Sequence, residues 1–257
     1  MRLTDEHVRA FLDDGLVLID DVLADDELTG ASRGVDHLYA TGERDNGIVG
    51  LFDEPGLLHI LAHPNLEAIA KKMLNADHVV LNSAASLYRK PNDTSEWTLD
   101  PGEHVDIMFS LDEMAATPRR MLAMMMVFIE DLPPGRGNTW VRLGSHRRIA
   151  EHLQQNNLDP IKAQPTFTKD LPDLDVAELT PVVAKRGQVA AFTTALMHCG
   201  SSNIDTQPRK ILFVNFSPRG LLWQTSGNYN RRERQIAWRQ RLCEQFPAAR
   251  RHLVASE

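Results

Sequence analysis

Apolar and polar positions change their period several times along the first 75 residues. Residues 4–14 place apolar side chains at helical spacing, Gly15 interrupts that pattern, and the apolar run LVLID at 16–20 follows. A second helical pattern begins near Asp25, and a third, with a proline near its start, covers 64–75. We therefore expect the N-terminal part to form a short helix, a strand and then further helices.

From residue 78 onward the pattern favours strands. The candidate strands are separated by turn sequences such as PPGRGN and SSNIDTQP. Strands at this spacing, without helices between them, predict an antiparallel barrel or sandwich. The candidates are 78–91, 104–111, 120–132, 138–143, 187–194 and 209–218.

Two long segments without periodicity, 91–103 and about 153–181, are expected to be loops, and loops of this length are usually functional or disordered. Either could serve as a lid. The C-terminal segment is rich in arginine and places Ile236, Leu242 and Phe246 on one face of a predicted helix. We interpret it as a surface helix, and the alternative is an anion-facing patch for a phosphorylated or CoA-linked substrate.

Composition narrows the function classes. The chain has 257 residues, of which 42% are hydrophobic and 25% charged, and its net charge of -7 argues against a nucleic-acid binder. Its two cysteines, Cys199 and Cys243, exclude a cysteine zinc site, argue against a disulfide framework and fit a reducing compartment. Because the N-terminus is charged and no long apolar run occurs, we expect a cytoplasmic protein without membrane contact that acts on a small molecule; its oligomeric state stays open.

The candidate chemistry begins with His104 and Asp106, two residues apart on a predicted strand and therefore on one face of it. Alone, such a pair is more often a polar pair on a solvated strand. A third candidate, His198, ends one predicted strand, and Arg209 begins the next. Two imidazoles and one carboxylate are the ligand set of non-haem Fe(II) oxygenases, and an arginine nearby would suit a carboxylic acid co-substrate.

In this combination and order the sequence resembles the phytanoyl-CoA dioxygenase family of Fe(II)/2-oxoglutarate oxygenases. The resemblance extends over most of residues 4–220. It rests on the opening AFLDDGLVLIDDVLADDEL at 10–28, His104-x-Asp106, FIEDLPPGRGNTWVRLGSH at 128–146, KRGQVAAFTTALMHCGSSN at 185–203, and Arg209.

The resemblance implies a mainly β fold with flanking helices, whose core is a double-stranded β-helix of the jelly-roll, cupin-like kind. It implies one oxygenase domain over 1–257, with N-terminal support in 1–77, the β-helix core in about 78–220 and a helical segment in 228–257.

The resemblance also implies the reaction. His104, Asp106 and His198 would ligate Fe(II), and Arg209 would bind the distal carboxylate of 2-oxoglutarate. The expected reaction consumes O2 and 2-oxoglutarate, releases succinate and CO2, and hydroxylates an unactivated C–H bond of a small molecule. Relatives that are halogenases have a small residue in place of the carboxylate, so Asp106 argues for oxygenation.

Further candidates follow the same resemblance. Lys90 matches a Lys-Pro step near the co-substrate, and Thr139 matches a threonine in the family's Gly-x-Thr turn. Met126 departs from a tryptophan common in relatives and is a candidate substrate contact, as are the loop tryptophans Trp97 and Trp223.

Three other features are interpreted as structural. His146 is expected to stabilise its own part of the chain, because three ligands already fill one face of an octahedral metal. Cys199 should lie on the opposite face of its strand from His198 and be buried. The methionines in 121–126 are expected to fill the core.

Two alternative functions remain open at this point. The same cofactors could serve desaturation, epoxidation or cyclisation of a natural-product scaffold. The chain could instead be a cupin-like metal-binding or small-molecule-binding protein without 2-oxoglutarate turnover.

Overall fold

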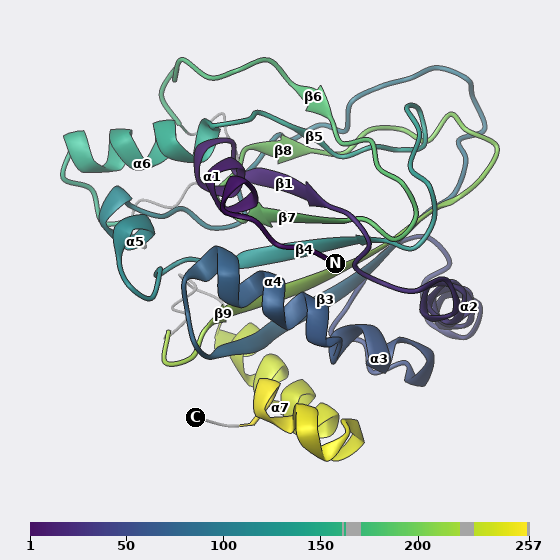
Figure 1. Cartoon of the computed structure of the whole chain (residues 1–257). Coiled ribbons are helices and arrows are strands. Elements are labelled where there is room, and N and C mark those ends of the chain that lie inside the picture. The colour runs from purple at the N-terminus through teal and green to yellow at the C-terminus, as the bar shows by residue number, and fades with distance from the viewer. Residues whose placement is uncertain (161, 163–170, 222–228, 256–257) are drawn as a thin grey trace.

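Two antiparallel sheets form the centre of the computed structural model, which describes residues 1–160, 162, 171–221 and 229–255 (Figure 1). The six-stranded sheet has the order β1 (Leu16–Ile19), β7 (Val189–Thr193), β4 (Ala123–Phe128), β9 (Arg209–Pro218), β3 (Val79–Arg89) and β2 (Gly47–Gly50). The second sheet has the order β6 (Thr180–Pro181), β5 (Trp140–Val141) and β8 (His198–Cys199). Every strand pair is antiparallel, so the predicted mainly β fold of the jelly-roll kind is confirmed.

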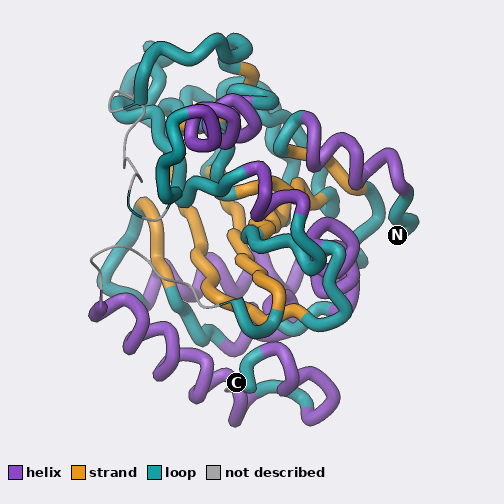
Figure 2. The backbone as a smooth tube through the Cα atoms, turned by 90° about the vertical axis from the view of Figure 1, so that its left-hand side faces the viewer, coloured by secondary structure: helices purple, strands orange, loops and turns teal. Residues whose placement is uncertain are grey.

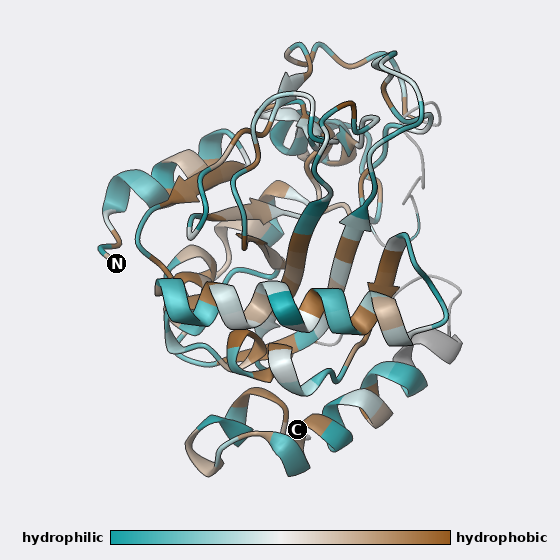
Figure 3. Ribbon diagram, turned by 90° about the vertical axis from the view of Figure 1, so that its right-hand side faces the viewer, coloured by the Kyte–Doolittle hydropathy of each residue, from teal (hydrophilic) through white to brown (hydrophobic). Residues whose placement is uncertain are grey.

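Helices cover one face of the large sheet, whose strands lie side by side in Figure 2. The residues buried on that face come from the N-terminal helices, from the sheet and from the C-terminal helix. The helical elements are α1 (Asp5–Asp13), α2 (Asp25–Thr41), η1 (Pro55–Leu57), α3 (Leu58–Leu61), α4 (Pro64–Leu74), α5 (Leu111–Ala115), α6 (Ser145–Gln155), α7 (Tyr229–Gln245) and η3 (Ala248–Leu253). Figure 3 shows that the helices carry both hydrophobic and hydrophilic residues, as expected of helices with one buried side.

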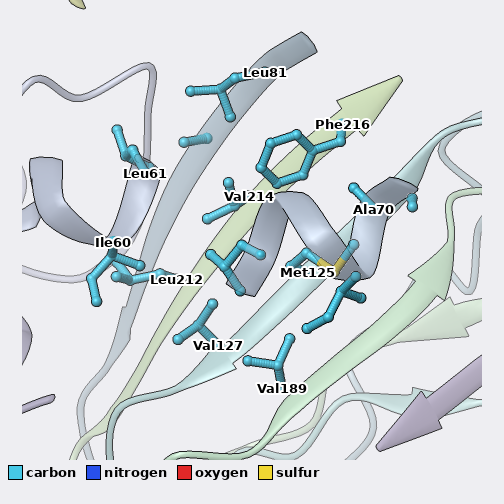
Figure 4. Packing of buried hydrophobic residues seen from close by; sticks show 14 of the residues in the cluster. Ile60, Leu61, Ala70, Leu81, Met125, Val127, Val189, Leu212, Val214 and Phe216 are labelled. Atoms are coloured by element: carbon cyan, nitrogen blue, oxygen red, sulfur yellow. The ribbon is translucent and has the colours of Figure 1, made fainter. Parts of the chain in front are cut away.

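The sheet has two faces, and both are buried along β4. Met125 and Val127 point to the helix-covered outer face, where they pack with Ile60 and other residues of Figure 4. Met124 and Met126 point to the inner face, toward the second sheet. A strand buried on both faces is apolar throughout, so the prediction that the methionines fill the core is confirmed.

Local sequence determines where several elements begin and end. Thr4 caps α1, because its hydroxyl accepts from the backbone N–H of His7. Pro64 occupies the first turn of α4, and Asn75 ends that helix in the left-handed conformation. Gly15 turns the chain from α1 into β1 with φ +81°, and a Cβ there would lie 2.6 Å from Nδ1 of His146.

The structure corrects three predictions. Residues 104–111 do not form a strand, because only His104 makes a single bridge and α5 begins at Leu111. The predicted loop at about 153–181 begins inside α6, a helix that the sequence analysis did not predict. The predicted C-terminal helix exists, but Ile236 is 47% exposed and Trp238 is buried in its place. Within the described part of the chain, no helix has the length and apolarity needed to cross a bilayer.

Candidate active site

Three metal-capable side chains converge between the sheets. Ligand atoms of His104, Asp106 and His198 all lie within 4.8 Å of one another. The backbones of His104 and His198 pair as a bridge, with both N–H to O distances at 2.9 Å, and their ring centroids are 4.3 Å apart. The structure therefore brings together the three residues that the sequence singled out as candidate ligands.

Asp106 reaches this position from an irregular segment instead of a strand. The backbone N–H groups of Asp106 and Ile107 both donate to the carbonyl of Thr194, at 2.9 and 3.1 Å. Val105 and Met108 turn away to pack on α6, in a cluster with Ile149, Leu153 and Met197. The apolar alternation that predicted a strand is thus explained by burial against a helix.

Hydrogen bonds fix the tautomer of both imidazoles. Nδ1 of His104 lies 2.9 Å from the carbonyl of Gly102, and Nδ1 of His198 lies 2.8 Å from the carbonyl of Leu196. A carbonyl only accepts, so each Nδ1 carries the hydrogen and each Nε2 presents its lone pair. Burial also lowers the pKa of His198, which keeps this imidazole neutral as a metal ligand must be.

Arg209, at the first position of β9, is a buried cation with neutral partners. Its guanidinium donates to the carbonyl of Gly137 and, at 2.7 Å, to the hydroxyl of Thr139, while Nε has no hydrogen-bond partner. The side chain is 2% exposed, and no carboxylate of the described residues lies within ion-pair distance of it. Burial, together with the charge of Arg89, lowers the pKa of Arg209 to about 9. The charge of Asp100 opposes this shift in part, and a bound anion would stabilise the cation further.

Arg89, which the sequence analysis missed, shares the inner face with Arg209, because the two residues are direct cross-strand partners on β3 and β9. It forms a bidentate pair with Asp100, at 3.0 and 2.6 Å, and also donates to the carbonyl of Ser201. Lys90 follows the strand and binds Asp45 at 2.6 Å, so the structure does not bring it to Arg209. The register of β3 with β9 identifies Arg89 as the neighbour of Arg209, and the sequence alone does not show this register.

The remaining candidates are dispersed. The rings of Trp97 and Trp140 lie 5.1 Å apart, and Trp97 is 40% exposed. Met126 is fully buried on the inner face of the large sheet. Trp223 lies outside the described residues. Cys199 is buried next to His198, as predicted.

An antiparallel jelly-roll in which two imidazoles and a carboxylate converge has the architecture of the non-haem iron oxygenases. A model of the phytanoyl-CoA dioxygenase family matches residues 11–211, more than half of the chain. The chain therefore belongs to the phytanoyl-CoA dioxygenase family, and the predicted family and its dioxygenase class are confirmed. No curated protein sequence matches the chain.

Solved structures with the same fold are distant in sequence. The non-haem alpha-ketoglutarate-dependent carbocyclase SnoK from nogalamycin biosynthesis has a TM-score of 0.65 at 17% identity, covering 89% of each chain. EctD from S. alaskensis with 2-oxoglutarate and 5-hydroxyectoine has a TM-score of 0.59 at 18% identity, covering 86% of this chain and 78% of its own. HygX from Streptomyces hygroscopicus with nickel and 2-oxoglutarate has a TM-score of 0.59 at 17% identity, covering 85% and 88%. At these identities the similarity shows the fold.

Proposed function

We propose that the chain is an Fe(II)- and 2-oxoglutarate-dependent oxygenase that hydroxylates an unactivated C–H bond of a small molecule. The observation that carries the proposal is the buried guanidinium of Arg209, whose hydrogen-bond partners in the protein are all neutral. The same domain also contains the triad of His104, Asp106 and His198. Such a pair of features suits one ligand that has a distal carboxylate for the arginine and metal-binding oxygens at its other end.

The residues fit a metal ion. His104 and His198 would each offer Nε2, because Nδ1 is engaged with a backbone carbonyl, and Asp106 would offer a carboxylate oxygen. Three protein ligands would leave coordination positions for other groups. Bound Fe(II) would supply a centre at which dioxygen is reduced at the expense of 2-oxoglutarate, which leaves as succinate and CO2.

The residues also fit the co-substrate. The guanidinium of Arg209 would pair with the distal carboxylate of 2-oxoglutarate, and Thr139 would hold that guanidinium in place through its hydroxyl. Arg89 would add positive potential from the neighbouring strand, while its pair with Asp100 holds the segment before His104 against β3.

Hydroxylation is the outcome that we favour, and desaturation, epoxidation or cyclisation would use the same ligands. Structures of this fold include an epimerase and a carbocyclase, so the fold leaves the outcome open.

We further propose that residues 1–257 act as one domain, with support in 1–77, core in about 78–220 and a C-terminal helical segment in 228–257. The buried core that joins the N-terminal helices, the sheet and α7 supports this division. Two free cysteines support a cytoplasmic location, and the net charge of -7 supports a small-molecule substrate over a nucleic acid.

Anaerobic titration tests the function. Fe(II) and then 2-oxoglutarate are added to metal-free protein, and the visible metal-to-ligand charge-transfer band of a chelated keto acid is recorded. We expect the band in the parent and in the control His78→Ala, an exposed histidine, and its loss in His198→Ala. Iron binding without the band in the parent would favour a cupin-like metalloprotein, and absence of iron binding would refute the metal site.

A further inference from the structure

Three polar side chains, Ser83, Asn215 and Ser217, lie on the inner face of the large sheet at the C-terminal half of β9. Asn215 is the direct cross-strand partner of Ser83 on β3 and of Met124 on β4, and Met124 belongs to the inner apolar cluster. Ser217 follows two residues later and therefore shares the face of Asn215.

Asn215 is aligned, across the strands of the large sheet, with Phe192, which contacts His198 of the triad. We call such a set of directly paired residues on neighbouring strands a row. On the other side of Met124 the row continues to Phe192, whose ring centroid is 5.8 Å from that of His198. Adjacent strands are about 4.8 Å apart, so Asn215 lies two strands, about 10 Å, from Phe192. Arg209 is six residues away along β9, about 20 Å. The polar group is therefore separate from the proposed co-substrate end and lies across the row from the triad.

The polar group has unused hydrogen-bonding capacity. Nδ2 of Asn215 donates to the hydroxyl of Ser83 at 2.8 Å, which leaves Oδ1 buried without a partner among the described residues. Ser217 is 1% exposed, and within the same part of the chain its hydroxyl also has no partner. A buried acceptor and a buried hydroxyl without partners indicate that a further molecule completes them.

The surroundings limit the chemistry of that molecule. Asn215, Phe213 and Ala85 are only partly buried, whereas Met124 and Ser83 beside them are buried, so the inner face is accessible at this place. The β3 residue that pairs with Ser217 and the β4 residue that pairs with Asn215 are apolar, and the inner-face cations of β3 and β9, Arg89 and Arg209, lie at the opposite end of these strands. Among the described residues, an ionic substrate group would find no counter-charge there.

We propose that Asn215 and Ser217 bind a hydroxyl or N–H group of the substrate, and that the substrate is a neutral, largely apolar scaffold carrying such a group. Oδ1 of Asn215 accepts the hydrogen bond, and the hydroxyl of Ser217 donates to the same oxygen or to a neighbouring one. This inference rests on the proposed function and specifies its substrate class: an alcohol or a lactam is bound here, and a carboxylate or a free amino acid is not.

Ligand-observed NMR on the metal-free full chain tests the substrate class with three probes of one shape. The probes are 1-adamantanol, its methyl ether, which lacks the donor, and adamantane-1-carboxylate, which is charged. We expect 1-adamantanol to bind the parent in preference to the other two and to lose about tenfold in affinity in Asn215→Leu, the equivalent of one hydrogen bond. Ser217→Ala should give a smaller loss.

Ser86→Ala is the matched control for Ser217→Ala. Ser86 is fully buried on β3 and its hydroxyl also lacks a partner among the described residues, but it pairs with Leu212 and so faces the helices. Its substitution should leave probe binding unchanged. The inference is overturned if the alcohol fails to bind the parent, if the carboxylate binds equally well, or if Asn215→Leu and Ser217→Ala bind the alcohol as the parent does.

Thermal unfolding of the same variants separates recognition from a structural role. Ser217→Ala removes a buried hydroxyl that lacks a partner among the described residues, so its Tm should equal or exceed that of the parent, whereas Asn215→Leu also loses the hydrogen bond to Ser83 and should have a slightly lower Tm. A Tm lowered by several degrees in both would show that the polar group maintains the fold, and would overturn the inference.

The binding experiment uses neither iron nor 2-oxoglutarate, so its outcome is independent of the test of the proposed function. If the charge-transfer band is absent from the parent, the proposed function fails; if the band is present and the probes do not discriminate, only the substrate class fails.

Discussion

At the scale of single residues, the arrangement around Arg209 explains why the site suits a dicarboxylic co-substrate. A guanidinium removed from water loses hydration that two neutral acceptors restore only in part. A bound carboxylate would supply two charge-assisted hydrogen bonds and the missing negative charge. The complex with the anion would thus recover a further part of the free energy lost when the residue is buried.

We predict that Arg209→Leu raises the 2-oxoglutarate concentration needed for half-maximal turnover by about 10- to 150-fold, since a charge-assisted hydrogen bond contributes about 1.5–3 kcal/mol. The requirement for the primary substrate should change much less. Steady-state succinate release at varied 2-oxoglutarate measures the effect. Lys90→Met is the control, because Lys90 binds Asp45 instead, and it should behave as the parent. Equal titration curves for Arg209→Leu and the parent would contradict the assignment.

Most of this site could be predicted from the sequence, because the motifs have fixed residue types in a fixed order. His104, Asp106, His198 and the threonine beside Arg209 were all identified that way. Arg89 was missed because only the pairing of β3 with β9 shows which of two consecutive basic residues shares a face with Arg209. Register depends on the whole sheet, and one sequence does not show it.

At the scale of elements, a buried carboxylate on α4 is one of the contacts that hold the C-terminal segment to the body of the protein. Glu67 on α4 is 6% exposed and binds Lys71 at 2.8 Å, Arg250 at 2.6 Å and His252 at 3.1 Å. Burial alone would raise its pKa, but these hydrogen bonds and charges lower it to about 2. Two of the three partners lie on η3, so the cluster connects residues that are far apart in the chain.

We predict that Glu67→Gln lowers the free energy of unfolding by about 3 kcal/mol, because removal of one partner from a buried ion pair leaves the other charges uncompensated. Urea unfolding measures the loss, and hydrogen exchange should show faster exchange in η3. The same substitution at Glu6, whose side chain is 84% exposed, should change stability by less than about 0.5 kcal/mol. Unchanged protection of η3 in Glu67→Gln would contradict the role of this cluster.

The missed and misassigned elements have one cause. Helix α6 buries Ile149, Ala150 and Leu153, a spacing that is typical of a helix, but its N-cap residue is Gly144, which has no side chain to cap it. Without α6, the apolar positions of 104–111 had no apparent partner except a sheet. Burial against an unpredicted helix and alternation in a strand give the same short pattern, which is why that strand was wrong.

At the scale of the whole molecule, His146 links the first and middle thirds of the chain. It lies on α6, is 1% exposed, and its Nε2 is 3.0 Å from the carbonyl of Leu12 on α1, beside the turn at Gly15. Burial lowers its pKa from 6.5 to about 4. The prediction of a structural histidine therefore agrees with its position, and it has a consequence for global stability.

Because the folded-state pKa of His146 is depressed, its neutral form is favoured by the fold, and its contribution to stability is complete above pH 6.5 and is lost as pH falls toward 4. A shift of this size corresponds to about 3 kcal/mol.

We predict that the free energy of unfolding falls less steeply between pH 6.5 and 4 in His146→Gln than in the parent, whatever the difference in stability between the two proteins at pH 7.5. Urea unfolding at several pH values measures the slopes, with His78→Gln as the exposed control. The fold lowers the pKa of Glu67 from 4.5 to about 2, so Glu67 loses its contribution to stability only as the pH falls from 4.5 toward 2. The two residues therefore act in largely separate pH ranges. Parallel curves for His146→Gln and the parent would show that another group causes the loss of stability in mild acid.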